Sequence, residues 1–98
     1  MSSGESWDLL PPAEHLGLTF HMTCPAYPEQ YDVLDAEGNQ VGYARLRHGV
    51  FRVDAQECGG PTVLVQSFSD EPTKGEFSGP GERDFWLDVA ARRLQGQP

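Results

Sequence analysis

The sequence predicts a single α+β domain, in which an antiparallel β-meander of about five strands packs against one C-terminal α-helix. Three observations lead to this fold class. Short segments alternate apolar and polar residues with period two, two-residue turns containing glycine separate several of them, and one apolar stripe at helical spacing closes the chain. A length of 98 residues suits one domain with a modest core.

Residues 1–15 are predicted to be a flexible N-terminal tail, so that the domain occupies residues 16–95. Small polar residues open this segment, and Pro11 and Pro12 prevent a helix from continuing through it. Trp7, Leu9 and Leu10 either fold back onto the domain or form a short linear motif for a partner. Both readings stay open.

Residues 16–24 show the clearest alternation and predict the first strand. One face of this strand is apolar and is expected to enter the core; it carries Leu16, Leu18, Phe20, Met22 and Cys24. Cys24 is therefore expected to behave as a small buried hydrophobic residue.

Three further strands are predicted over residues 30–35, 40–47 and 50–56, with turns at Glu37-Gly38 and His48-Gly49. The second turn sets Leu46 opposite Phe51 and Arg45 opposite Arg52. The first sets Val33 opposite Gly42 and Leu34 opposite Val41, and the two registers agree. Together they predict an uncharged core face that collects Tyr31, Val33, Gly42, Ala44, Leu46, Phe51, Val53 and Ala55. A one-residue slip would bury arginines instead, which favours this register.

A turn at residues 58–61, a strand at 62–68 and a loop at 69–81 lead to a helix over residues 82–94. Its apolar stripe consists of Phe85, Trp86, Val89, Ala90 and Leu94. The small residues Gly42 and Ala44 are expected to leave room on the sheet for Trp86 and Phe85.

The charge balance and the absence of targeting signals limit the function classes. Fifteen acidic against seven basic residues give a net charge of −8, whereas nucleic-acid backbones are bound by clustered Lys and Arg. No stretch is apolar for the ~20 residues of a membrane helix, and no basic-then-apolar signal opens the chain. We expect a cytoplasmic protein with reduced thiols and no cofactor, whose partner is another protein; the oligomeric state stays open.

The histidines and cysteines are the first candidates for a metal site, because His21-x-x-Cys24, His48 and Cys58 supply zinc ligand types. On a regular strand, however, His21 and Cys24 point to opposite faces, and His48 lies at a hairpin tip. No nucleophile-elbow or phosphate-loop motif is present. We therefore predict neither a metal site nor a catalytic residue, and keep a small thiol- or zinc-dependent protein as an alternative.

The outer face of the meander is the unusual surface. The predicted register gathers Asp32, Tyr43, Arg45, Arg47, Arg52 and Asp54 on it. Arg45 and Arg52 would oppose each other on neighbouring strands, which destabilises a sheet unless carboxylates compensate. One interpretation is an arginine–carboxylate lattice made with Asp32 and Asp54. The other is a binding face, whose guanidinium groups and Tyr43 contact a carboxylate or phosphate of a partner.

Residues 31–60, YDVLDAEGNQVGYARLRHGVFRVDAQECGG, resemble a segment of small proteins from bacterial and bacteriophage genomes that have no assigned activity. The resemblance implies a bacterial or phage accessory protein with a hairpin core and a following helix, and it transfers no functional residues.

The leading hypothesis is a non-enzymatic interaction or regulatory protein that uses the outer face. The alternative is an acidic antagonist, encoded by a phage or mobile element, of a host nuclease or regulator.

Overall fold

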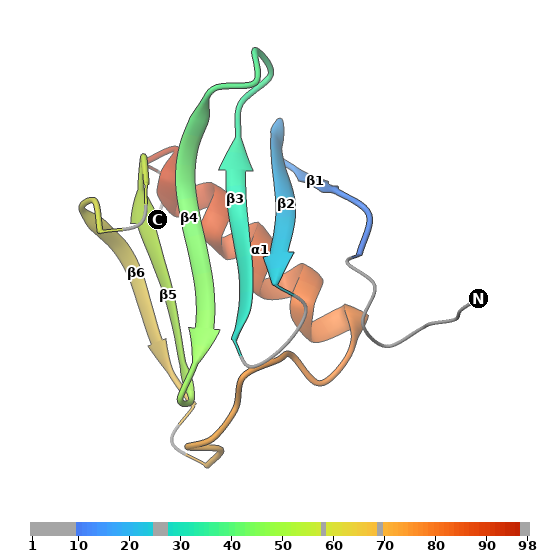
Figure 1. The fold of residues 1–98 in the computed structure, drawn as a ribbon, viewed down its shortest axis with the longest axis vertical. Helices are drawn as coiled ribbons and strands as arrows, with labels where there is room; N and C mark the ends of the chain where they lie inside the picture. Colours follow the sequence, from blue (N-terminus) through green and yellow to red (C-terminus); the bar gives the residue numbers. More distant parts are fainter. Residues whose placement is uncertain (1–9, 25–27, 58, 69, 97–98) are drawn as a thin grey trace.

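The computed structural model describes residues 10–24, 28–57, 59–68 and 70–96, and it has the predicted α+β fold. A six-stranded antiparallel meander has one helix on one of its faces (Figure 1). Each strand pairs with its neighbours in sequence, in the order β1-β2-β3-β4-β5-β6. The elements are β1 (Ala13–His15), β2 (Leu18–Cys24), β3 (Glu29–Leu34), β4 (Gln40–Arg47), β5 (Val50–Ala55), β6 (Thr62–Ser67) and α1 (Pro80–Leu94).

The N-terminal part of the sheet differs from the prediction. Ala13–His15, which the sequence analysis assigned to the tail, form the edge strand β1, while residues 1–9 lie outside the described residues. Leu16 (φ 54°) and Gly17 (φ 84°) turn the chain from β1 into β2, because both adopt the left-handed conformation of a tight hairpin. Leu16 is consequently 47% exposed and not in the core.

The two central hairpin turns set the registers as predicted, apart from one bulge. His48 (φ 52°) and Gly49 (φ 74°) make the tight turn between β4 and β5, and Arg45 stands opposite Arg52. Between β3 and β4 an irregularity sets Leu34 opposite Gln40, so its predicted partner Val41 is wrong. The Asp35 carboxylate accepts the N–H groups of Glu37 and Asn39 at 2.9 Å, which closes a longer loop than a two-residue turn.

A second bulge, between Met22 and Cys24, overturns the expected position of Cys24. Leu18, Phe20 and Met22 are buried as predicted. Cys24, however, stands opposite Gln30 and so shares the sheet face that points away from the helix. The extra residue of a bulge reverses the alternation of all residues that follow it in the strand.

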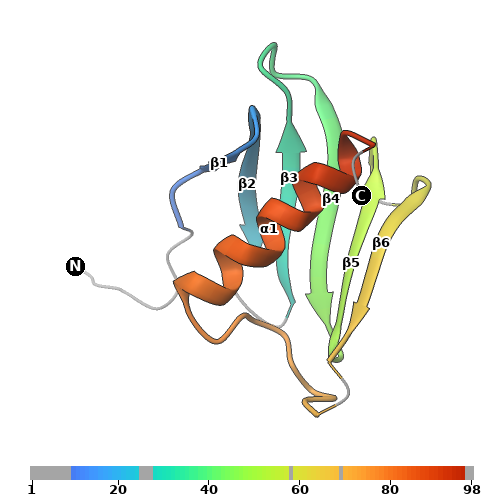
Figure 2. The ribbon, with the colours of Figure 1, turned by 180° about the vertical axis from the view of Figure 1, so that it is seen from behind.

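The helix α1 crosses the inner face of the sheet diagonally (Figure 2) and packs most of the predicted stripe against the core, with Phe85 as the exception. Leu87, Ala90 and Ala91 are buried, whereas Phe85 is 59% exposed. Leu94, and not Trp86, lies over Gly42, where an added Cβ would be 2.6 Å from Leu94 Cδ1. Trp86, Val89 and Leu94 are partly buried and pack against the core, and Trp86 makes T-shaped ring contacts with Phe51 and Phe68.

The inner face of the sheet is not free of charge, contrary to the prediction. Glu29, the first residue of β3, has no exposed surface, and its carboxylate binds Arg83 of α1 at 2.8 Å from Nε and 3.1 Å from Nη2. The Tyr31 hydroxyl donates to Glu29 at 2.7 Å and the Phe77 N–H donates at 3.2 Å. This network holds α1 to the sheet. The predicted strand starts one residue later, at residue 30, and so does not include Glu29.

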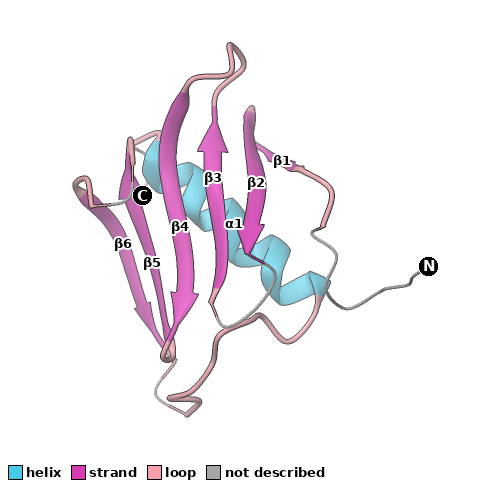
Figure 3. Ribbon diagram, in the orientation of Figure 1, coloured by secondary structure: helices cyan, strands magenta, loops and turns pink. Residues whose placement is uncertain are grey.

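The connection from β6 to α1 runs past the end of the sheet where β4 turns into β5 (Figure 3). The backbone carbonyls of Lys74 and Gly75 accept the N–H groups of Gly49 and Glu29 at 2.9 and 2.8 Å. The Lys74 ammonium is buried and binds Glu71 and Glu82 at 3.0 and 3.1 Å. Residues 71–75 of the predicted loop therefore pack against the hairpin tip at His48-Gly49.

Candidate binding face on the open side of the sheet

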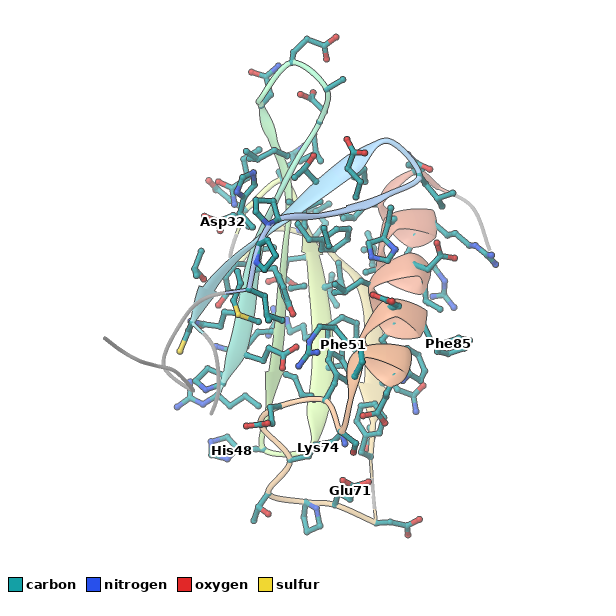
Figure 4. The ribbon with its side chains drawn as sticks, turned by 90° about the vertical axis from the view of Figure 1, so that its right-hand side faces the viewer. Asp32, His48, Phe51, Glu71, Lys74 and Phe85 are labelled. Atoms are coloured by element: carbon teal, nitrogen blue, oxygen red, sulfur yellow. The ribbon has the colours of Figure 1, made fainter. Side chains whose placement is uncertain are left out.

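The side of the sheet that faces away from α1 carries the six predicted site residues. Figure 4 shows Asp32 directed away from the helix, whereas Phe51 lies between sheet and helix. No element of the described ranges covers this side (Figures 1 and 2). We call it the arginine face and define it by Asp32, Tyr43, Arg45, Arg47, Arg52 and Asp54, which β3, β4 and β5 supply.

Asp54 and Arg52 form the first part of the expected arginine–carboxylate lattice. Arg52 Nε donates to Asp54 Oδ1 at 2.9 Å. Asp54 is only 2% exposed and also accepts the Gly59 N–H at 3.0 Å and the Thr62 hydroxyl at 2.9 Å. Burial raises the pKa of Asp54, but these hydrogen bonds outweigh burial and leave the pKa below its ordinary value. Asp54 thus fastens the loop between β5 and β6 and has little surface left for a ligand.

Asp32 does not complete the lattice. It stands opposite Tyr43 in the sheet register, and the contact that its side chain makes is with Gln40 Nε2, at 3.3 Å. The Tyr43 hydroxyl donates to Gln30 Oε1 at 2.5 Å, which holds the ring across β3. The carboxylate of Asp32 therefore leaves the charge of Arg45 uncompensated.

Arg45 and Arg47 are the arginines of this face whose charges stay available in the described part of the chain. Arg45 lies between Gln30 of β3 and Arg52 of β5, and within the described part of the chain its side chain has no ion-pair partner. Arg47 is exposed, and its Nε donates to His48 Nε2 at 3.2 Å. Two guanidinium groups with free donors thus stand two residues apart on the same face of β4.

A hollow forms where these arginines meet the hairpin tip. Arg45, Arg47, His48, Val50 and Arg52 line a shallow hollow of about 270 Å³. A neighbouring hollow of about 530 Å³ shares two of these residues; it is lined by Pro28, Gln30, Arg47, His48, Thr73 and Gly75. The concave surface therefore extends from the arginines towards the connection between β6 and α1, a part of the site that the sequence did not indicate.

The predicted ligands of the alternative zinc or thiol site do not gather in the described residues. The bulge in β2 brings Cys24 to the same face as His21, so the argument that they point to opposite faces is wrong. His48 remains at the tip between β4 and β5, and Cys58 lies outside the described residues. Within those residues no three His, Cys, Asp or Glu side chains are placed to hold a metal ion.

Comparisons with known proteins add no relative. No protein family, no curated protein and no solved structure matches the chain. None of the helices in the described ranges is long and apolar enough to cross a membrane.

Proposed function

We propose that this protein is a non-enzymatic interaction module whose arginine face binds an acidic segment of a partner protein. The observation that carries the proposal is the opposition of Arg45 to Arg52, with a carboxylate supplied to Arg52 alone. Such a pair costs stability in the free protein. A carboxylate from a partner would remove that repulsion, because it can accept hydrogen bonds from both guanidinium groups.

The surface chemistry favours an extended acidic peptide over a small molecule. The hollow is shallow, and it continues past Arg47 and His48 into the second hollow. Small-molecule sites enclose most of their ligand, whereas a flat sheet face suits a chain that lays several side chains across it. Forked guanidinium donors pair with carboxylates in two parallel hydrogen bonds.

The negative net charge of the chain helps to distinguish binding at the arginine face from nonspecific attraction. A protein with a net charge of −8 repels an acidic peptide unless a local cationic surface attracts it. We expect a fluorescently labelled oligo-glutamate peptide to bind at low ionic strength and to dissociate as salt is added. Each charge-assisted hydrogen bond that a variant removes should weaken binding about tenfold or more.

Arg45→Gln combined with Arg47→Gln is the test variant, measured by fluorescence anisotropy. Arg92→Gln combined with Arg93→Gln is the matched control, because it removes the same charge from the C-terminal turn of α1. The proposal expects a loss in the first variant and near-normal binding in the second. Equal losses in both, or no binding by the natural protein, would contradict it.

Stability separates binding from a structural role. Arg45→Gln removes the repulsion from Arg52 and should leave the free energy of unfolding unchanged or raise it by about 0.2–1 kcal/mol. Arg52 is a poorer probe, because its substitution also breaks the hydrogen bond to Asp54. A marked loss of stability in Arg45→Gln would instead support a purely structural arginine cluster.

A further inference from the structure

The strand β6 is an edge of the sheet that lacks the usual protection against pairing. It is six residues long, and its sequence TVLVQS holds no charged residue and no proline. Natural edge strands are blunted by charges, prolines, short length or a covering element. The opposite edge, β1, follows these rules: it is three residues long and includes Glu14.

The backbone of β6 leaves hydrogen-bonding groups at this open edge. The Phe68 N–H donates to the Gly49 carbonyl at 2.7 Å. By the alternation of an antiparallel ladder, Gln66 and Leu64 then also point their backbone groups towards β5. Val65 and Ser67 point theirs away from the sheet. At this edge Gln66 Nε2 donates to the Ser67 carbonyl at 2.9 Å and Arg93 Nη1 donates to the Val63 carbonyl at 3.4 Å; both contacts are exposed, and the N–H groups of a partner strand would replace them. The Val65 side chain is 60% exposed as well.

We infer that β6 pairs with β6 of a second copy of this chain, so that the two sheets form one continuous antiparallel sheet. A two-fold axis at Val65 lets the two Val65 residues exchange both of their backbone hydrogen bonds. A second β6 fits this edge because it opposes no like charges within the strand pair, although each chain carries a net charge of −8. The β-branched residues of TVLVQS favour the extended partner conformation.

The ionic-strength dependence follows from the same charges. Two bodies of like net charge that meet at a neutral strand repel each other less as salt increases. The dimer should therefore strengthen with salt, whereas binding of an acidic peptide to the arginine face should weaken. The two associations can thus be told apart in one protein.

Sedimentation velocity over a wide concentration range tests the inference. The natural protein should dimerise, and Val65→Lys should weaken dimerisation about tenfold or more, because the two-fold axis sets like charges side by side. Leu16→Lys is the matched control, because it replaces another exposed aliphatic residue, at the turn before β2. This variant should dimerise normally. Far-UV circular dichroism and thermal unfolding check that both variants fold.

Amide hydrogen exchange tests the mode of pairing. In the dimer the Val65 and Ser67 amides should be protected, and dilution to the monomer should release them. The Leu64 and Gln66 amides should stay protected at both concentrations, because they face β5. A protein that stays monomeric at all concentrations, or a dimer whose Val65 and Ser67 amides exchange freely, would overturn the inference.

Discussion

The buried Glu29–Arg83 pair gives the sharpest prediction about stability. The change is Glu29→Gln, which keeps the shape of the side chain and removes its charge. The carboxylate is fully buried and the Arg83 side chain is 19% exposed. Four donors surround the two carboxylate oxygens: Tyr31 Oη at 2.7 Å, Arg83 Nε at 2.8 Å, Arg83 Nη2 at 3.1 Å and Phe77 N at 3.2 Å. A glutamine presents its own donor to at least one of them.

The expected loss is large for a protein of this size. Removing one partner of a buried ion pair costs about 3–5 kcal/mol, because the remaining charge is left unpaired. Hydrogen bonds to the Glu29 carboxylate raise the pKa of Arg83 in the natural protein. In Glu29→Gln the guanidinium still stays charged, because arginine is not deprotonated in proteins, so deprotonation cannot relieve the loss. Domains are typically stable by about 5–15 kcal/mol. At about 4–8 °C per kcal/mol for a small domain, the melting temperature should fall by at least about 12 °C.

Urea unfolding followed by circular dichroism measures this loss, and two further variants make it specific. Tyr31→Phe removes one hydrogen bond to the carboxylate and should cost about 1.5–3 kcal/mol, less than Glu29→Gln. Replacing both Glu29 and Arg83 by methionine should recover most of the loss, because no unpaired charge remains. A loss below about 1 kcal/mol in Glu29→Gln, the size seen for exposed ion pairs, would refute the reasoning.

Two other predictions concern titrating groups away from this pair. The pKa of Asp54 lies below its ordinary value of 3.8, so as the pH falls Asp54 takes up a proton in the unfolded chain before it does so in the folded protein. The free energy of unfolding should therefore fall as the pH drops below about 4. Asp54→Asn should remove that part of the acid dependence while lowering stability at neutral pH. Lys74, the single lysine, has a side chain that is only 3% exposed. Its acylation by an amine-reactive ester, followed by mass spectrometry, should be slow in the native protein and fast in urea. Glu82→Gln should accelerate the acylation of the native protein. Equal native and denatured rates would contradict the burial of this ammonium group.

The hairpins could be predicted because their turns are short and their two faces differ. A two-residue turn at His48-Gly49 fixes every pair between β4 and β5. A one-residue slip would have buried arginines. The bulges at Val33/Leu34 and Met22/Cys24 could not be predicted, because the turns and contacts that absorb an extra residue are tertiary. The predicted pairing of Val41 with Leu34 and the predicted burial of Cys24 are wrong for that reason.

The wrong position of Phe85 and the omission of Glu29 are both connected with Arg83. The buried side of α1 follows Arg83, Leu87, Ala90 and Leu94 in steps of three and four residues. An apolar pattern taken from the helix alone includes Phe85 and does not include Arg83, because Arg83 is charged. The stripe is stable only because Glu29, 54 positions earlier, neutralises Arg83. Such a pairing between distant residues leaves no periodic signal.

The sequence predicts which residues share the candidate site. It does not predict which contacts each of these side chains makes. Tyr43, Arg45 and Arg52 lie on one face, as the alternation indicates. The role of Asp54 depends on Gly59 and Thr62 beyond the strand, which the sequence does not place. The second hollow depends on how the chain from β6 to α1 passes the hairpin tip.

A nuclear magnetic resonance titration of the isotopically labelled protein with an oligo-glutamate peptide tests the central claim most directly. Binding at the arginine face predicts amide shift changes centred on Arg45, Arg47 and Arg52, weaker changes at Thr73 and Gly75, and none along the exposed side of α1 around Phe85. Shift changes centred on α1, or none at any peptide concentration, would contradict the account.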